Sequence, residues 1–276
     1  MEIRFQESPE GTAGMQTDEL RKHFLCEGII GKDRISLVYS HYDRMILGGI
    51  SPLKKELSLD ADPELRADYF LERRELGIIN AGGKGFVETD TGKYELDKLS
   101  CLYLGKGTKK IRFSSESAAD PAVFYFLSAP AHATWPNRLM KKEEASPVST
   151  GAVETSNKRT IYKYIHLDGI QSCQLVMGLT VLAVGSVWNS VPPHTHTRRM
   201  EAYFYFDLPE AHRVFHFMGE PRETRHLVMS NHQAVISPPW SIHCGCGTTN
   251  YAFIWGMAGE NKTFTDMDPA PVAELK

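Results

Sequence analysis

The chain has 276 residues and a mass of 31.0 kDa, enough for one large domain or two smaller ones, with 42% hydrophobic and 24% charged residues. A formal net charge of −3 and the lack of a long apolar run give no reason to expect binding to nucleic acid or to a membrane. The first five residues do not form the apolar segment of a signal peptide, and five cysteines without framework spacing predict reduced thiols, so we expect a cytoplasmic protein.

Short strands predominate among the elements expected in the first half of the chain. One helix is predicted at Thr17–Phe24, with Thr17 as its N-cap and Glu19 in its first turn. Strands are expected at residues 35–39, 45–47, 77–80, 85–88, 101–103, 111–113 and 122–127, and glycine-containing breaks separate many of them. Many short strands with regular turns predict a sandwich or a barrel.

The second half of the chain is also rich in predicted strands. Residues 131–160 are rich in Lys, Glu, Ser, Thr and Pro, which is typical of a solvated connection. A strand-rich stretch follows from residue 161 to 256, and a polar tail runs from 260 to 276. We therefore expect a mainly β protein with a few short helices, divided into a first domain (1–130), a connection (131–160) and a second domain (161–276).

The two halves resemble one another around a pair of arginines. Arg73-Arg74 has a glutamate close behind it, as Arg198-Arg199 has Glu201. Each pair is followed by a strand pattern, a turn and a further apolar run, which suggests two copies of one barrel. In the first copy, tyrosine and leucine at positions 69 and 71 stand where the second copy has histidines, so only the second copy would bind a metal.

The histidines of the second half form the most distinctive motif. Side chains two apart on a strand share a face, so His194 and His196 can point at one ion. Glu201 lies an odd number of residues beyond His196, so we expect a short bend through 197–200 and a new strand at Glu201. His243 follows a Pro-rich turn and would arrive from a neighbouring strand. The alternative is two surface histidines on a loop and an unrelated core histidine.

These motifs resemble the two signature motifs of the cupin superfamily, His-x-His-x4-Glu and Pro-x-Trp-x-x-His. Two departures are that the usual glycine of the first motif is displaced to Gly185 and that Trp240 stands at the usual glycine of the second. More specifically, the chain resembles the 5-keto-4-deoxyuronate isomerase family, also called 4-deoxy-L-threo-5-hexosulose-uronate ketol-isomerases. The matching segments span nearly the whole chain in order: 38–44, 69–77, 104–107, 129–132, 173–175, 193–196, 198–201, 203–206, 223–226, 241–243 and 253–257.

The resemblance implies a two-barrel cupin subunit, a homohexamer and one zinc ion in the second barrel, with His194, His196, Glu201 and His243 as ligands. It also implies that the chain converts 5-dehydro-4-deoxy-D-glucuronate into 3-deoxy-D-glycero-2,5-hexodiulosonate in pectin degradation, without an organic cofactor. Independently of the resemblance, three imidazoles and one carboxylate leave open positions on a divalent ion, as catalytic sites do. A cation bound to a carbonyl and the adjacent hydroxyl oxygen would stabilise the enediolate of an aldose–ketose exchange.

The other candidate site residues follow from alternation and charge. Tyr203 and Tyr205 share the face of Glu201, so Tyr203 is a candidate for moving the proton, together with His226 and a metal-bound hydroxide. Barrel-filling aromatic residues and a packed histidine are the alternatives. A uronate substrate requires a partner for its carboxylate, ideally an arginine. The candidates are Arg198 and Arg199, which could equally form a solvated pair, and, more weakly, His41, Arg44 and Lys163.

Two other functions remain open at this stage. The same ligand types in a cupin can hold Fe(II) and activate oxygen, because histidine and carboxylate suit several divalent ions. A non-catalytic sugar-binding double barrel, held together by its metal, is the second alternative. The matching segments outside the metal motif favour the isomerase, since a dioxygenase has no need to share them.

Overall fold

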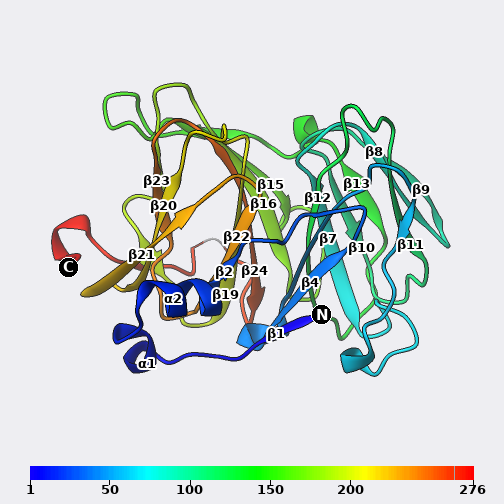
Figure 1. The fold of residues 1–276 in the computed structure, drawn as a ribbon, viewed down its shortest axis with the longest axis horizontal. Helices are drawn as coiled ribbons and strands as arrows, with labels where there is room; N and C mark the ends of the chain where they lie inside the picture. The colour runs from blue at the N-terminus through cyan, green and yellow to red at the C-terminus, as the bar shows by residue number, and fades with distance from the viewer. Residues whose placement is uncertain (264) are drawn as a thin grey trace.

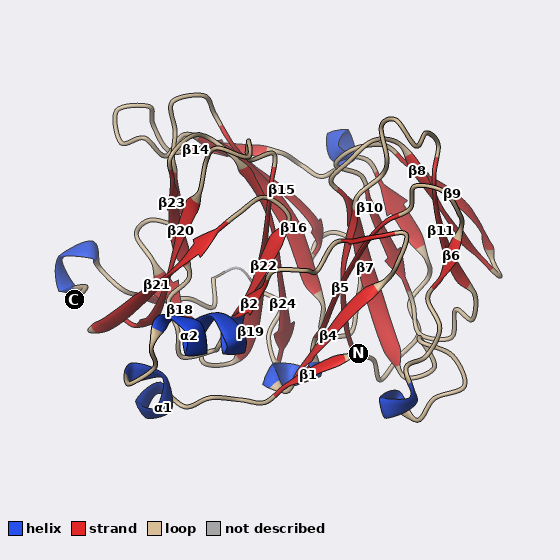
Figure 2. Ribbon diagram, in the orientation of Figure 1, coloured by secondary structure: helices blue, strands red, loops and turns tan. Residues whose placement is uncertain are grey.

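The protein is a pair of β-barrels lying side by side, as the ribbon in Figure 1 and its secondary-structure colouring in Figure 2 show. The computed structural model describes residues 1–263 and 265–276. The predicted fold class, a mainly β chain with two cupin-type barrels and a few short helices, is confirmed. In these residues no helix has both the length and the apolar character needed to cross a bilayer.

The first barrel is built from a large and a small sheet. The strands of the large sheet are, in spatial order, β1 (Glu2–Arg4), β4 (Ser36–Ser40), β5 (Ile46–Ser51), β12 (Phe124–Pro130), β7 (Arg74–Asn80), β10 (Cys101–Leu104) and β13 (Arg138–Met140), with β3 (Gly31–Lys32) beside β5. The small sheet contains β6 (Leu57–Ser58), β11 (Ile111–Ser115), β8 (Gly85–Thr89) and β9 (Gly92–Leu96). The short 3-10 helices of this half are η1 (Tyr42–Arg44) and η2 (Pro63–Leu65).

The second barrel has the same construction. Its large sheet contains β14 (Val148–Thr150), β15 (Arg159–Ile165), β16 (Val176–Leu182), β24 (Ala252–Gly259), β19 (Arg199–Phe206), β22 (Gln233–Ser237) and β2 (Leu25–Cys26). Its small sheet contains β17 (Trp188–Asn189), β23 (Cys244–Gly247), β20 (Val214–Glu220) and β21 (Glu223–Met229). The remaining elements are the pair β18 (His194–Thr195) and β25 (Asp268–Pro269), and the 3-10 helices η3 (Lys142–Glu144) and η4 (Val272–Glu274).

Strand order supports the internal repeat. The order β4-β5-β12-β7-β10 of the first large sheet corresponds to β15-β16-β24-β19-β22 of the second. Strand β7 begins at Arg74 and β19 begins at Arg199, the second arginine of each pair recognised in the sequence. The two arginines therefore occupy corresponding places at the start of corresponding strands.

Strand pairing crosses the expected sequence boundaries. Strand β2 lies within residues 1–130 but pairs with β22 of the second barrel, and β13 lies within 131–160 but pairs with β10 of the first. The N-terminal region also contains two helices rather than one, α1 (Pro9–Ala13) and α2 (Thr17–Phe24). The N-cap of α2 is Gln16 rather than Thr17, because Gln16 and Glu19 form a reciprocal capping box.

The two large sheets share one hydrophobic core, to which both barrels contribute. The rings of Tyr125 on β12 and Phe204 on β19 stack with their centroids 4.4 Å apart. The carboxylate of Glu75, at the start of β7, is fully buried and accepts hydrogen bonds from three successive backbone N–H groups of the second half, at residues 173–175. Each large sheet therefore has one face in its own barrel and one face against the other barrel.

Candidate metal centre

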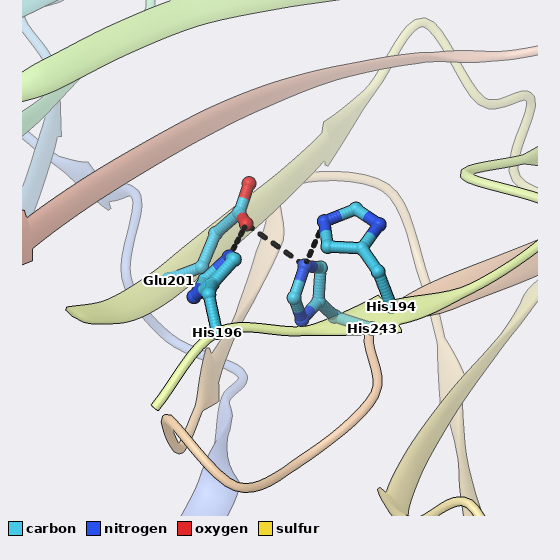
Figure 3. Close-up of side chains that lie close together, drawn as sticks. All are labelled: His194, His196, Glu201 and His243. Carbon is cyan, nitrogen blue, oxygen red and sulfur yellow. Dashed lines mark hydrogen bonds and ion pairs between the residues drawn. The ribbon is translucent and has the colours of Figure 1, made fainter. Parts of the chain in front are cut away.

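Four side chains of the second barrel converge at one point (Figure 3). His194 lies on β18, His196 follows in the turn, Glu201 lies near the start of β19, and His243 directly precedes β23. Each offers one ligand atom, and these atoms all lie within 4.8 Å of one another. The turn at residues 197–198 changes the direction of the chain, as the odd spacing between His196 and Glu201 requires. The strand that follows, β19, begins at Arg199, two residues earlier than expected.

The distances among these groups suit a shared cation. Glu201 Oε2 lies 3.0 Å from Nε2 of His196 and 2.9 Å from Nε2 of His243. The Nε2 atom of His243 also lies 3.1 Å from Nε2 of His194. A neutral imidazole has a single N–H group. If that proton is on Nδ1 in both rings, two Nε2 atoms that face one another are both acceptors and no hydrogen bond joins them. A divalent ion among the four atoms would satisfy all of them, so the donor set fits a metal.

Backbone carbonyl groups orient two of the rings. His196 Nδ1 lies 2.9 Å from the carbonyl oxygen of Arg199, and His243 Nδ1 lies 3.3 Å from that of Ser241. With the proton on Nδ1, each ring donates to its carbonyl group and turns the lone pair of Nε2 toward the cluster. Such a second contact is what holds a metal-binding histidine in the required tautomer.

Burial and charge set the protonation states that a metal requires. Burial by itself raises the pKa of Glu201, but His243 and His196 together hold that pKa well below its usual range. Burial and the neighbouring His243 lower the pKa of His194 to about 3. At neutral pH the carboxylate is therefore ionised and the imidazole of His194 is neutral, which are the metal-binding forms.

A cavity of about 350 Å³ opens beside the cluster and is lined by His194 and Glu201. Tyr203, two residues along β19, also lines it, and its hydroxyl group lies 2.8 Å from Oγ of Ser190. Burial and the charge of Glu201 raise the pKa of Tyr203 well above its ordinary value. The Tyr203 hydroxyl therefore stays protonated and can donate a hydrogen bond to a ligand. Tyr205, deeper in the barrel, pairs instead with Nδ1 of His216 at 2.9 Å.

The arginine pair divides between two environments. Arg199 is almost fully buried and lines the cavity, but its Nη1 atom donates to the carbonyl oxygens of Asn261 and Thr263. Arg198 points away and forms ion pairs with Asp266 and Asp268. Arg199 therefore braces the wall of the cavity, and Arg198 is held outside it by two carboxylates.

The other candidates from the sequence do not meet at this cavity. His226 lies exposed on β21, near the ring of Phe215, because alternation on that strand turns it outward. His41 and Arg44 line a different cavity, in the first barrel. Lys163 lines neither of these cavities.

The cavity contains one functional candidate that sequence reasoning missed. Arg159 begins β15, lines the cavity with Ile161, and is half-buried. Its Nη1 atom donates to the carbonyl oxygen of Asn157 at 2.8 Å. Burial lowers the pKa of Arg159, while the nearby Tyr203 raises it. The alternation of Arg159 and Ile161 on one strand is a usable signal, but the polar composition up to residue 160 predicts a connection there instead.

The chain is similar to known proteins over its whole length. The sequence profile of the KduI/IolB family matches residues 30–272. Proteins called 4-deoxy-L-threo-5-hexosulose-uronate ketol-isomerase from Shouchella clausii and Yersinia pseudotuberculosis are 54% and 52% identical over 276 and 278 aligned residues, covering 100% of both chains in each comparison.

Solved structures share the fold at low sequence identity. An IolB-like protein of Salmonella typhimurium has a TM-score of 0.62 and 15% identity, covering 79% of this chain and 85% of that one. Oxalate decarboxylase of Bacillus subtilis, studied for its Mn(II) centres, has a TM-score of 0.55 and 8% identity, covering 80% and 70%. The expected resemblance to the uronate isomerases is confirmed by the sequence relatives, and the chain belongs to the KduI/IolB family as an enzyme of the ketol-isomerase class.

Proposed function

We propose that the protein is a zinc-dependent aldose–ketose isomerase that converts 5-dehydro-4-deoxy-D-glucuronate into 3-deoxy-D-glycero-2,5-hexodiulosonate during the degradation of pectin. The observation that carries the proposal is the cluster of three imidazoles and one carboxylate at the wall of an open cavity. Full-length similarity to relatives named as uronate ketol-isomerases supports the substrate class.

The metal and the chain have separate tasks in this proposal. A bound zinc ion supplies positive charge that stabilises the negative charge developing on two neighbouring substrate oxygens. His194, His196, Glu201 and His243 hold that ion, and the carbonyl groups behind His196 and His243 keep two of the rings in place. Zinc is preferred over iron on chemical grounds, because the reaction moves a proton between neighbouring carbons and needs no redox change.

Tyr203 and Arg159 are proposed to bind the organic part of the substrate. The protonated hydroxyl group of Tyr203 donates to a substrate oxygen, and Ser190 Oγ, 2.8 Å away, keeps that hydroxyl in position. Arg159 reaches the same cavity from β15 and pairs with the substrate carboxylate. This assignment gives the uronate a cationic partner in place of Arg198, whose guanidinium group already binds two carboxylates.

The test is turnover of 5-dehydro-4-deoxy-D-glucuronate by the purified protein, measured as isolated, after chelation and after addition of zinc. We expect turnover to disappear with the chelator and to return with zinc. Turnover that survives complete removal of metal would contradict the proposal. If metal-loaded protein shows no turnover but consumes oxygen with iron, the protein is a dioxygenase instead.

A single substitution separates a catalytic metal from a structural one. Glu201→Gln removes the charged ligand, so we expect at least about a hundredfold loss of turnover together with loss of bound zinc. Glu220→Gln, at an exposed position of β20, is the matched control and should keep both. If Glu201→Gln lowers the melting temperature but leaves turnover unchanged, the metal only holds the fold.

Assembly and location complete the proposal. We propose a homohexamer, as the family resemblance implies, and a cytoplasmic location, which suits the five free cysteines. Light scattering coupled to size-exclusion chromatography measures the number of subunits, and any size other than six would contradict this part alone.

A further inference from the structure

The first barrel contains a cavity of its own that the proposed reaction does not use. It measures about 440 Å³, close to the size of the cavity at the metal centre, and lies over β4, β7 and β12. These strands correspond to β15, β19 and β24, which carry the metal-centre cavity. The two cavities share the arginine that begins β7 and β19, but the first is lined by Tyr39 near the end of β4 and the second by Arg159 and Ile161 near the start of β15.

The chemistry of this cavity is cationic. Arg44, Arg73 and Arg74 line it, with Glu64 as the acidic residue in its lining. By its place at the start of β7, Arg74 corresponds to Arg199 of the second barrel. At the position two residues along, where β19 has the carboxylate of Glu201, β7 has Leu76. The first cavity thus keeps the arginine and lacks the ligand for a metal.

Arg74 is a buried cation that forms no ion pair with any of the described residues. It is 7% exposed, its Nε atom donates to Ser128 Oγ at 3.0 Å, and its Nη2 atom donates to the carbonyl oxygens of Ser128 and Arg44. All of these acceptors are neutral, and within residues 1–263 and 265–276 Nη1 donates to no group. Burial lowers the pKa of Arg74 to about 10, although the nearby Tyr39 and Glu75 act in the opposite direction. The guanidinium carbon also lies 5.9 Å from the centroid of the Tyr39 ring, so the cost of the buried charge is only partly offset.

The loop after β4 adds a second free cation and an aromatic wall. Asp43 and Arg44 both have positive φ angles, 47° and 52°, a conformation that is uncommon for residues other than glycine. This strained turn presents the exposed Arg44 to the cavity, and Arg44 forms no ion pair with any residue in the described part of the chain. His41 and Tyr39 pack edge to face with their centroids 5.4 Å apart and form the adjoining wall.

We propose that this cavity is a binding site for a small organic carboxylate of sugar-acid size, separate from the metal centre. The Nη1 atom of Arg74 can donate to one oxygen of a carboxylate, because its Nε and Nη2 atoms already bind Ser128 and Arg44. The exposed guanidinium group of Arg44 can bind the carboxylate in a fork geometry. The half-buried ring of Tyr39 and the side chains of Ile3 and Leu65 in the lining suit the apolar face of a sugar. A carboxylate is preferred to inorganic phosphate because these apolar walls offer phosphate no further donors.

The test uses a uronate that cannot be isomerised. Methyl α-D-glucuronide has no free carbonyl group, and methyl α-D-glucopyranoside is its neutral counterpart. Isothermal titration calorimetry of the zinc-loaded full chain measures how many molecules of each compound bind per chain, and with what affinity. We expect Arg74→Met and Arg44→Gln each to weaken one equivalent of glucuronide binding by about tenfold or more, and the neutral glycoside not to bind there.

Matched variants keep the result interpretable. Arg112→Gln, at an exposed position of β11, is the control and should retain wild-type stoichiometry. Arg44→Gln guards against misfolding of Arg74→Met, because the Arg44 side chain is exposed. The measured quantity is the number of glucuronide molecules bound per chain, and the variants are expected to lose one of them. The result can therefore be interpreted whether or not the metal centre also binds the glucuronide. Equal binding in all proteins, no binding at millimolar concentration, or binding of phosphate in place of the glucuronide would each overturn the proposal.

Discussion

Arg159 is proposed to bind the substrate carboxylate through its positive charge. Replacing Arg159 with glutamine removes a charge-assisted hydrogen bond to the substrate carboxylate, which is worth about 1.5–3 kcal/mol. We therefore expect KM to rise by about tenfold or more in steady-state assays, with a smaller change in kcat. The exposed neighbour Lys158→Gln is the control. If Arg159→Gln keeps the wild-type KM, another group binds the carboxylate.

His216 makes stability depend on pH. Its ring is fully buried in the second barrel, with Nδ1 against Tyr205, and its Nε2 atom has no hydrogen-bond partner among the described residues. Burial and His243 lower the pKa of His216 from 6.5 to about 3 in the folded state. Between these two pH values the unfolded state binds more protons, so the free energy of unfolding falls as the pH falls, by up to about 1.4 kcal/mol per pH unit.

A substitution at His216 isolates this effect. His216→Asn keeps a partner for Tyr205 but cannot titrate, so its free energy of unfolding should fall less steeply than that of wild type below pH 6.5. Urea unfolding at several pH values measures the two slopes. His132→Asn, at an exposed position, should leave the slope as in wild type. Parallel curves for wild type and His216→Asn would show that His216 does not carry the dependence.

At the scale of elements, the approach of the two large sheets depends on Gly77 of β7. A Cβ atom at this position would lie 2.7 Å from Ile165 Cδ1, 2.8 Å from Met177 Sδ and 2.9 Å from Leu175 Cδ2, all of the second half. These three side chains are fully buried, so they have little room to move. The absence of a side chain on β7 is therefore what allows the second barrel to pack this closely.

We expect Gly77→Ala to lower the free energy of unfolding by about 1–3 kcal/mol, the usual cost of overpacking a core. Urea denaturation measures this change. The control is Gly14→Ala, because a Cβ atom there would have nothing within 4 Å. If both variants unfold at the wild-type urea concentration, the two large sheets can move apart at Gly77 without loss of stability. The close contact at Gly77 would then not be what holds the barrels together.

The elements also show where reasoning from sequence succeeds and where it stops. Strands such as β4, β8, β10 and β11 were expected within a residue or two of their observed bounds, because alternation and nearby glycines are local signals. The two-residue strand β2 has no such signal, and its pairing with β22 depends on a neighbour far along the chain. The prediction of Thr17 as the N-cap of α2 is wrong, although the spacing of Gln16 and Glu19 is that of a capping box.

At the scale of the whole molecule, the barrels share too much structure to unfold separately. One hydrophobic core contains residues of both halves, β2 crosses from the first half into the second barrel, and Glu75 binds three backbone N–H groups of the second half. We expect a single calorimetric transition whose van't Hoff and calorimetric enthalpies agree. Chelation should lower its midpoint without splitting it, because a bound metal stabilises only the folded state. Two resolved transitions would mean that the barrels are independent.

The group of possible metal ligands and the class of fold could be predicted from the order of residues alone. The close spacing of His194, His196 and Glu201 along the chain predicted that they come together, although it is the turn after β18, and not alternation along one strand, that does so. Similarly, the density of short strands and the repeated arginine pair were sufficient to expect two β-barrels. Tertiary structure decided the rest, because cavities and interfaces join residues that are distant in sequence. Only the folded chain turns Arg198 toward two aspartates, brings Arg159 to the metal centre, and leaves Arg74 and Arg44 beside a separate cavity in the first barrel.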